Sequence, residues 1–546
     1  MGIPSYYKKL IGTVPGLVSK GYPESTISWL FMDFNCLIYH CLHREDTPVY
    51  PGPAEKDTWE SAFLVCVVTY CLKVIKQVKP TKGVYIAIDG VVPMAKMRQQ
   101  RLRRFKSIWL TQHGSGEGGE GEGGEESKET WDRNAITPGT LFMGKLRKQL
   151  EGMIAKHGKK TWKLSSSDEP GEGEHKLIRE WRTGKYAGNY AVYGLDADLI
   201  VLSMLGHETA NLGDKSKNKI WLFREEVQAG KIAYDAAGEE EFEWFSVSAL
   251  TEWLCGDKSV GSRQFVLDYC FAMSVLGNDF VPSSLGLKIR EDGHGELLDV
   301  LARLHPQGMC LVDQETLSLR TEGLVELFRL LAVDEEHRIT KYVSKKQYAS
   351  RNLVGAEGKG NCAIGDNDWP MYHMEEDVLL GSGRKLVDDW QSVYLTRFFP
   401  GFHASDKRKI CGEYLYGIQW IWAYYTGRHT DVCYDWCYSF SLPPLWSWIH
   451  SHLVKEGGLP AFPEQVLIRA DDILPVEQLA LVLPLESWSL LPPCPQRALP
   501  YLAPHLFPAS FSFDSVGKRF FWECESLIPL PSIEAIKHIV ASAPLP

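Results

Sequence analysis

Seven carboxylates in this sequence share one setting, because most of them follow an apolar run and stand next to small, loop-forming residues. They form two tight pairs and three lone positions: Asp33, Asp89, Glu172 with Glu174, Asp196 with Asp198, and Asp279. Carboxylates with apolar neighbours repel one another on burial unless a cation neutralises them. Oxygen ligands of this kind suit Mg²⁺ or Mn²⁺. Each pair alone could be a solvated turn, but the recurrence at five places favours a divalent metal site.

A cationic segment follows the second of these carboxylates. Six cations occur in the eleven residues from Lys96 to Lys106. Lys96, Gln100, Arg103 and Arg104 fall at i, i+4, i+7 and i+8, so a helix would place them on one face, with Arg98 and Arg101 pointing elsewhere. Such a face beside a metal site suits a terminal phosphate held by forked guanidinium bonds. A solvated helix or a nuclear address is the alternative, and the position directly after Ala87–Gly90 favours phosphate binding.

The elements that must position these groups alternate between strands and helices. Apolar runs at 29–32, 84–88 and 190–193 predict strands that lead to Asp33, Asp89 and Asp196. Helical patterns lie between them, at 60–77 and 142–157, and a helix opens at Glu174. This order predicts a mostly parallel sheet with crossover helices, and in such sheets ligands bind at the carboxyl ends of the strands.

The second half of the chain has a different composition. From about residue 291 the pattern becomes helix-rich, and from Trp369 it is rich in aromatic residues and proline. We therefore expect a catalytic domain over 1–290 and a second, mixed lobe over 291–546 packed on it. Residues 114–127 contain seven Gly, five Glu and no cation, which predicts a disordered loop inserted in the first domain.

Composition limits the class of protein. A hydrophobic content of 44% and an aromatic content of 12% indicate a folded globular enzyme. With a net charge of −10, contact with nucleic acid must come from local basic patches. No signal-peptide run follows Met1 and no window approaches 18 uninterrupted apolar residues, so we expect no membrane span. The cysteines show no disulfide framework, which favours a cytoplasmic location, with the nucleus as the alternative.

Motifs over residues 1–290 resemble the Xrn family of 5′→3′ exoribonucleases in order and spacing. They are Met1–Pro4, Met32–Asn35, Ala87–Gly90, Pro93–Phe105, Ile136–Thr140, Pro170–Lys176, Tyr193–Ile200 and Gly277–Phe280. Looser matches to the second conserved region of the family are Tyr416–Trp420, Ala423–Tyr425, Pro475–Leu479 and Leu527–Pro529. The long extension of the large cytoplasmic members does not follow, so the chain resembles a minimal catalytic core.

The resemblance implies a PIN-like, flap-nuclease-related catalytic domain with two Mg²⁺ ions, for which Mn²⁺ could substitute. It assigns the seven carboxylates as metal ligands, and Lys96, Gln100, Arg103 and Arg104 as the pocket for a 5′-monophosphate. The implied activity is processive 5′→3′ hydrolysis of single-stranded RNA to nucleoside 5′-monophosphates during RNA decay. We expect a monomer.

Two positions depart from the family pattern. The family commonly has His six residues after the first metal-binding Asp, where it stacks on the terminal base, and this chain has Tyr39 there, with His40 and His43 nearby. A tyrosine ring offers an equivalent stacking face. The second stacking residue aligns best with Trp436. For both residues, ordinary core packing is the alternative.

Three other functions share parts of this pattern. A flap or repair nuclease acting on DNA would share the carboxylates, but residues 280–287 lack the Gly-rich helix-hairpin-helix that such enzymes place after the last Asp. A catalytically weak RNA-binding scaffold should have lost carboxylates, and none is missing. A phosphatase of small metabolites would need neither the basic helix nor the aromatic lobe.

Overall fold

The main sheet joins strands from the first half of the chain around a parallel centre. The computed structural model describes residues 3, 5–113, 130–210, 218–228, 231–256, 262–356, 362–428, 432–462, 468–493 and 503–542. The sheet order is β1-β9-β6-β5-β2-β3-β4, where β6, β5, β2, β3 and β4 run parallel, β9 pairs antiparallel with β6, and β1 pairs antiparallel with β9. The strands are β1 (Val18–Ser19), β2 (Trp29–Asp33), β3 (Gly83–Ala87), β4 (Lys163–Ser165), β5 (Tyr190–Tyr193), β6 (Ile220–Glu225) and β9 (Phe242–Ser246).

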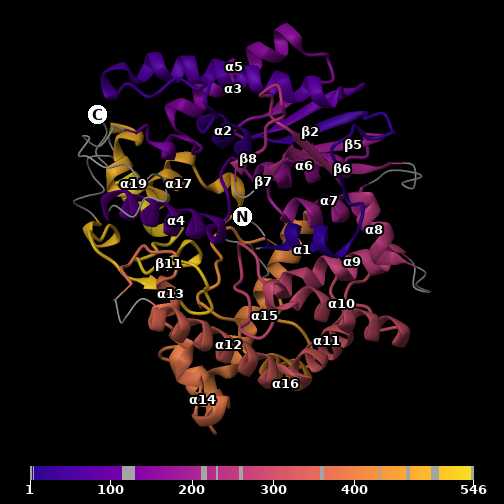
Figure 1. Ribbon diagram of the computed structural model, residues 1–546, viewed down its shortest axis with the longest axis vertical. Helices are drawn as coiled ribbons and strands as arrows, with labels where there is room; N and C mark the ends of the chain where they lie inside the picture. The colour runs from indigo at the N-terminus through magenta and orange to yellow at the C-terminus, as the bar shows by residue number, and fades with distance from the viewer. Residues whose placement is uncertain are drawn as a thin grey trace.

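Helices cover both faces of this sheet (Figure 1). Those of the first half are α1 (Tyr6–Thr13), α2 (Asn35–Leu42), α3 (Lys56–Val78), α4 (Met94–His113), α5 (Leu141–His157), α6 (Gly173–Arg182), α7 (Asp198–Thr209), α8 (Val247–Cys255) and α9 (Ser262–Ala272). The predicted strands and helices are confirmed, with ends that shift by a few residues. The predicted loop at 114–127 lies outside the described residues.

Alternating side chains along the central strands enter two separate cores. On β2, Leu30 and Met32 pack with α2, α3 and α5, whereas Phe31 packs on Trp181 of α6. Since successive side chains of a strand point to opposite faces, a strand that is apolar at every position must be covered on both sides. The expected α/β class, a mostly parallel sheet flanked by helices, is confirmed.

Helix α3 is the one described helix that is long and apolar enough to cross a membrane, judged over Pro53–Val78 by length and composition alone. Its side chains Trp59, Phe63 and Val67 are buried in the core between the sheet and α5. This packing accounts for its apolar composition.

The second half of the chain is helix-rich and aromatic-rich, as expected. Its helices are α10 (Gly293–Leu304), α11 (Thr321–Val333), α12 (Glu335–Ala356), α13 (Trp369–Tyr372), α14 (Trp390–Phe398), α15 (Lys407–Thr426), α16 (Trp446–Glu456), α17 (Pro475–Val482) and α19 (Ile533–Ala541). One hydrophobic cluster runs from the α6–α9 side of the sheet through α10, α11, α15 and α16. The predicted boundary between residues 290 and 291 therefore crosses a continuous core, and it stays a prediction.

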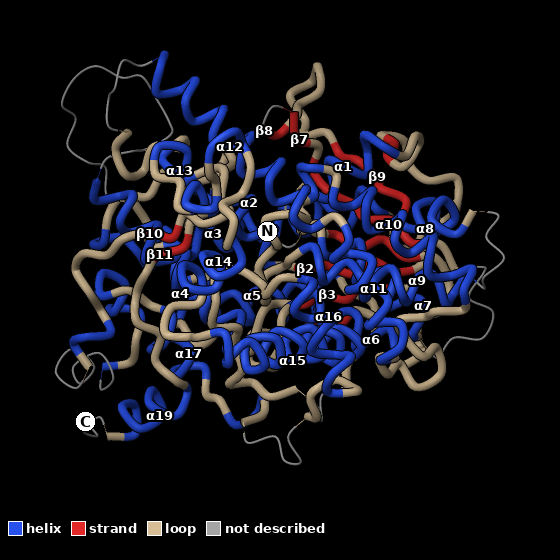
Figure 2. The backbone as a smooth tube through the Cα atoms, turned by 90° about the horizontal axis from the view of Figure 1, so that it is seen from below, coloured by secondary structure: helices blue, strands red, loops and turns tan. Residues whose placement is uncertain are grey.

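The last part of the chain returns to the first half and packs around α4. In Figure 1 the yellow α17 lies beside the violet α4. Helix α17 and β11 (Glu525–Ser526) contact α4, and α19 packs on α17. Strand β11 pairs with β10 (Phe513–Asp514), and Figure 2 shows this ribbon away from the main sheet. A second small ribbon joins β7 (Val227–Gln228) to β8 (Lys231–Ile232).

Arg101 connects α4 to this returning segment. Its fully buried guanidinium donates to the carbonyl oxygens of Leu481 (2.6 Å), Pro529 (3.1 Å) and Leu506. Burial lowers the pKa of Arg101 to about 9. As the helical spacing predicts, Arg101 lies off the face that holds Lys96 and Gln100.

We expect Arg101→Leu to lower the free energy of unfolding by roughly 3 kcal/mol or more, because three buried carbonyl oxygens lose a charged donor. Urea denaturation, with Arg98→Leu on the same helix as the control, measures this. Arg98 contacts Glu525 at the partly exposed surface, so its loss should cost about 1 kcal/mol or less. Equal midpoints for the two variants would contradict a structural role for Arg101.

Candidate functional site

The seven carboxylates converge at the carboxyl edge of the parallel strands. Asp33 ends β2, Asp89 follows β3 by two residues, and Asp196 follows β5. Glu172 caps α6 and Asp198 begins α7. Helix N-termini carry partial positive charge and stabilise nearby carboxylates. The remaining members are Glu174 in the first turn of α6 and Asp279 after the 3₁₀ turn Met273–Leu276.

Gly173 permits the closest approach in this group. A Cβ atom at Gly173 would lie 2.5 Å from Asp33 Oδ1 and 3.1 Å from the carbonyl oxygen of Ala87, so any larger residue would displace the Asp33 carboxylate. The backbone N–H of Gly173 donates to Asp89 Oδ1 at 2.6 Å. Asn35 donates to the other oxygen of Asp89 at 2.9 Å. Asp89 is thus held on both sides.

The carboxylates interact strongly with one another. Loss of hydration raises the pKa of Asp33 well above its usual value, and Asp89, Asp196 and Asp198 raise it further. For Glu174 the same loss of hydration raises the pKa, followed by repulsion from Asp198 and Glu172. Burial and the neighbouring Asp196 raise the pKa of Asp198 to about 7. The cluster therefore holds more negative charge than its surroundings compensate.

Lys96 lies inside this cluster. Its Nζ is 2.6 Å from Glu172 Oε2 and 2.8 Å from Asp279 Oδ2. Burial alone would lower the pKa of Lys96, but Asp279 and Glu172 raise it well above its usual value. For Asp279, burial raises the pKa and Lys96 more than offsets that effect, so the result is a lowered pKa. Among the described residues, the Lys96 ammonium does not balance the charge of seven carboxylates.

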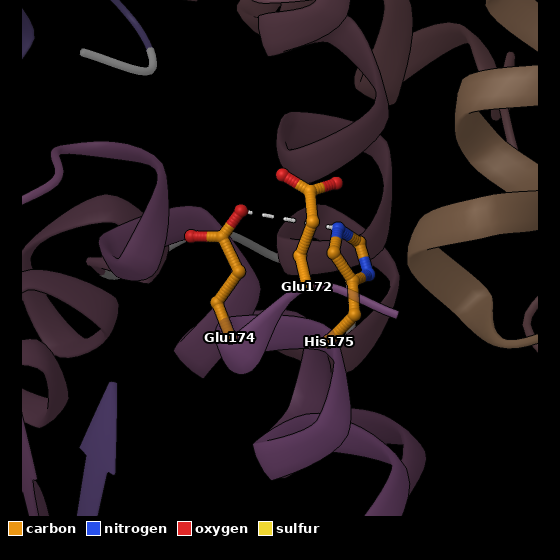
Figure 3. Close-up of side chains that lie close together, drawn as sticks. All are labelled: Glu172, Glu174 and His175. Carbon is orange, nitrogen blue, oxygen red and sulfur yellow. Dashed lines mark ion pairs between the residues drawn. The ribbon is translucent and has the colours of Figure 1, made fainter. Parts of the chain in front are cut away.

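The donor set fits divalent cations. Figure 3 shows the side chains of Glu172, Glu174 and His175 close together, and their ligand atoms lie within 4.8 Å of one another. Asp198 is 4% exposed, and its Oδ1 has no hydrogen-bond partner among the described residues. A buried, unpartnered carboxylate oxygen beside other carboxylates is a suitable ligand for a hard cation. The residues present thus fit Mg²⁺ or Mn²⁺.

The cationic residues of α4 differ in their surroundings. Gln100 is buried and accepts from Gln478 Nε2 at 3.5 Å, whereas Arg103 is exposed. Arg104 is 7% exposed, and its Nη1 has no hydrogen-bond partner in the part of the chain that the structure describes. Burial lowers the pKa of Arg104 to about 10, which Tyr39 partly opposes and Arg103 reinforces. A buried guanidinium nitrogen without an acceptor is a ready donor for an anion.

The candidate stacking residues come from different parts of the chain, Tyr39 from α2 and Trp436 from the segment after α15. Tyr39 is half-buried on α2, close enough to Arg104 to influence its pKa. His40 is unsuited to stacking on a ligand, because its Nε2 lies 3.0 Å from Glu240 and its ring packs on Tyr70. His43 is exposed and follows the last residue of α2.

Trp436 packs within the second lobe. Its ring contacts Trp420 of α15 at a centroid distance of 5.0 Å, and a Cβ atom at Gly417 would lie 2.8 Å from it. Trp436 is half-buried, so one part of the ring faces outward. The stacking roles of Tyr39 and Trp436 stay predictions.

Several residues of the site were not predicted. Asn35, Gly173 and His175 stand inside motifs next to the carboxylates, so proximity in the sequence could have identified them. Tyr424, whose hydroxyl donates to Glu172 Oε1 at 3.0 Å, comes from a segment 252 residues away and carries no local signal of this contact.

The fold and the site define an α/β protein with a cluster of carboxylates, suited to binding divalent cations, at the carboxyl edge of a parallel sheet. Residues 1–212 match the family described as XRN 5′-3′ exonuclease N-terminus. The chain is 27% identical to 5′-3′ exoribonuclease 1 of Homo sapiens and 25% identical to 5′-3′ exoribonuclease 2 of Gallus gallus, and each comparison covers 97% of this chain. It is 30% identical over 71% of its length to 5′-3′ exoribonuclease 2 of Saccharomyces cerevisiae. These matches support the assignment of this chain to the Xrn family.

The lengths of these relatives differ from that of this chain. The chain spans 33% of the human protein, 68% of the chicken protein and 45% of the yeast protein. Among solved structures, the catalytic core of Rad2 in complex with a DNA substrate matches 74% of this chain and 88% of that chain at a TM-score of 0.30 and 12% identity.

Proposed function

We propose that this chain is a processive 5′→3′ exoribonuclease that hydrolyses single-stranded RNA with a 5′-monophosphate to nucleoside 5′-monophosphates. The observation that carries the proposal is the convergence of seven carboxylates beside the cationic face of α4. Assignment to the Xrn family supports it, because the curated relatives are named 5′-3′ exoribonucleases.

The proposed cofactors are two Mg²⁺ ions, for which Mn²⁺ could substitute. The residues that would hold them are Asp33, Asp89, Glu172, Glu174, Asp196, Asp198 and Asp279. Ions bound there would supply an activated water and charge neutralisation at the scissile phosphate. Lys96, which now bonds to Glu172 and Asp279, adds positive charge at the same place. Asn35 and the N–H of Gly173 keep the Asp89 carboxylate in one orientation.

The proposed site for the 5′-monophosphate is the face of α4 formed by Lys96, Gln100, Arg103 and Arg104. The unpartnered Nη1 of Arg104 supports this assignment, since it is a buried cationic donor. Each cleavage would expose a new 5′-monophosphate that can occupy the same pocket, which makes digestion processive. A 5′-triphosphate or a cap exceeds the size of a closed pocket and should be rejected.

The direct test is digestion of one 3′-end-labelled RNA that carries a 5′-monophosphate, a 5′-hydroxyl or a 5′-triphosphate, with Mg²⁺ or EDTA. We expect mononucleotide release from the 5′-monophosphate RNA alone, and none in EDTA. A single-stranded DNA of the same sequence and a DNA flap serve as further arms. Preferential cleavage of the flap would favour the repair-nuclease alternative, and binding without cleavage would favour the RNA-binding scaffold.

Replacing Tyr39 tests the stacking proposal. Tyr39→Ala should cost about 1–3 kcal/mol in engaging the terminal nucleotide, because a base loses its aromatic face. The loss should appear as shorter runs on a long 5′-monophosphate RNA under single-hit conditions. Tyr39→Phe should be nearly silent, and Tyr39→His should also retain function. If the Ala and Phe variants have the same run length, Tyr39 is a packing residue.

A cytoplasmic location, with the nucleus as the alternative, and a monomeric state complete the proposal. Fractionation of cells and light scattering of the purified protein would test them.

A further inference from the structure

Tyr424 connects the second lobe to the carboxylate cluster. Its hydroxyl donates to Glu172 Oε1 at 3.0 Å, while Lys96 lies 2.6 Å from Glu172 Oε2. Tyr424 is 2% exposed and Glu172 is 3% exposed, so water does not compete for this hydrogen bond. Both oxygens of Glu172 are therefore held by side chains from distant parts of the chain.

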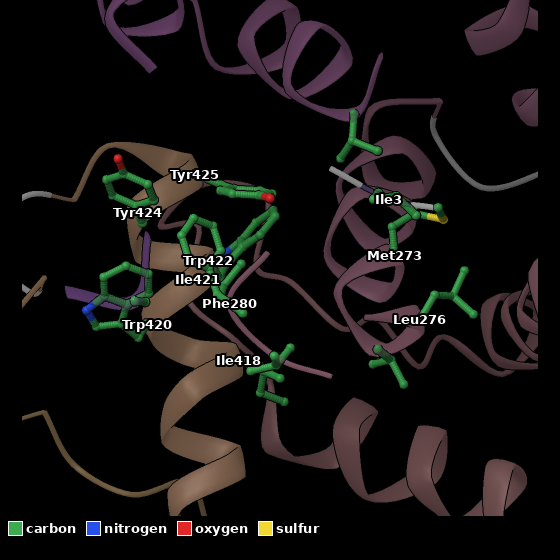
Figure 4. Packing of buried hydrophobic residues seen from close by; sticks show 14 of the residues in the cluster. Ile3, Met273, Leu276, Phe280, Ile418, Trp420, Ile421, Trp422, Tyr424 and Tyr425 are labelled. Atoms are coloured by element: carbon green, nitrogen blue, oxygen red, sulfur yellow. The ribbon is translucent and has the colours of Figure 1, made fainter. Parts of the chain in front are cut away.

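The ring of Tyr424 is fixed on three sides. It stacks on Trp420 of the same helix at 5.2 Å and 26°, and it contacts the tilted ring of His175 at 3.9 Å and 33°. Phe280, next to Asp279, meets it edge-on at 5.8 Å. Figure 4 shows Trp420 and Tyr424 projecting from α15. The packing therefore holds the Tyr424 hydroxyl at hydrogen-bonding distance from Glu172.

We propose that Tyr424 is a positioning residue that fixes the Glu172 carboxylate for a divalent cation, so that α15 of the second lobe completes the metal site. The inference rests on the proposed metal site, in which Glu172 is a ligand. Groups that hydrogen-bond to a ligating side chain orient it, and losing one typically reduces metal affinity or activity by about 10- to 100-fold. A carboxylate left without this donor in a buried setting could rotate away from the cation.

Tyr424→Phe removes the hydroxyl and keeps the ring. We expect it to raise the Kd for Mn²⁺, measured by isothermal titration calorimetry on the metal-free protein, by about 10- to 100-fold. Hydrolysis of 5′-monophosphate RNA should fall at low Mn²⁺ and recover at saturating Mn²⁺, while RNA binding stays constant.

Tyr414→Phe is the matched control. Tyr414 lies on the same helix and is fully buried, and its hydroxyl has no hydrogen-bond partner among the described residues. The same chemical change there should leave Mn²⁺ affinity and hydrolysis unchanged. An equal loss in both variants would attribute the effect to the packing of α15 and overturn the inference.

The Glu172→Gln variant tests whether Tyr424 acts through its hydrogen bond to Glu172 or through the packing of α15. If Tyr424 acts through Glu172, adding Tyr424→Phe to Glu172→Gln should not weaken Mn²⁺ binding further. The positioning role would be refuted if Tyr424→Phe weakened Mn²⁺ binding as much in the Glu172→Gln background as in the wild type. An unchanged Kd in Tyr424→Phe alone would also refute it. These binding measurements need no RNA, so an unexpected substrate would contradict the proposed function and leave this inference standing. Failure of the wild-type protein to bind Mn²⁺ would refute the proposed metal site itself, and the inference with it.

Discussion

Asp198→Asn should abolish hydrolysis and raise the thermal stability of the metal-free protein. Asp198 is buried, faces Asp196 and Asp279, and has an oxygen without a partner among the described residues. The amide keeps the shape of the side chain but removes one negative charge from a repelling cluster. Stabilisation of transition-state charge by a bound ion is worth several kcal/mol. We therefore expect a loss of about 10³-fold or more in rate.

Three measurements check this prediction. Single-turnover digestion of 5′-monophosphate RNA gives the rate, a melting curve in EDTA gives the stability, and an RNA-binding assay in EDTA should show affinity that is retained or increased. Asp299→Asn, at an exposed position of α10, is the control and should change none of them. Hydrolysis at the wild-type rate in the metal-replete Asp198→Asn variant would contradict metal binding at this cluster.

The parallel sheet and the carboxylates could be predicted because each depends on local pattern. The run 29–32 is apolar at every position, as a strand covered on both faces must be, and it ends at Asp33. Carboxylates at the ends of neighbouring parallel strands lie at the same edge of the sheet, whatever the conformation of the connecting loops. Glu172 and Asp198 also occupy positions set by local structure, since each stands where a helix begins.

Contacts between distant segments could not be predicted in the same way. The sequence pattern placed Lys96 with the phosphate-binding residues, yet its Nζ lies among the carboxylates, because the α4 N-terminus meets both Glu172 and Asp279. Arg101 stands in the same basic run as Arg104, and periodicity alone could not show that it ties α4 to three carbonyl oxygens more than 300 residues away. The sequence shows which side chains are charged, but the tertiary packing determines which groups they contact.

Arg104 is the residue of α4 best placed to recognise a terminal phosphate. It is buried near Tyr39, and its Nη1 lacks an acceptor among the described residues. Arg103, the next residue, is exposed and could add a second guanidinium. Hydrogen bonds to charged groups are worth about 1.5–3 kcal/mol each, and every 1.4 kcal/mol corresponds to a factor of ten. Arg103→Ala with Arg104→Ala should therefore reduce the preference for 5′-monophosphate over 5′-hydroxyl RNA by about 100-fold.

The preference must be measured as a ratio, since any damage to the fold slows both substrates. Arg104→Met retains most of the buried volume, so it controls for the cavity that alanine would leave. This single substitution should lower the ratio of 5′-monophosphate to 5′-hydroxyl RNA cleavage by about tenfold. Arg98→Ala is the matched control, because Arg98 lies on the same helix but bonds to Glu525. Its ratio should equal that of the wild type. If the Arg103 and Arg104 variants slow both RNAs by one factor, α4 contacts the RNA backbone in general, and the 5′ end must be selected elsewhere.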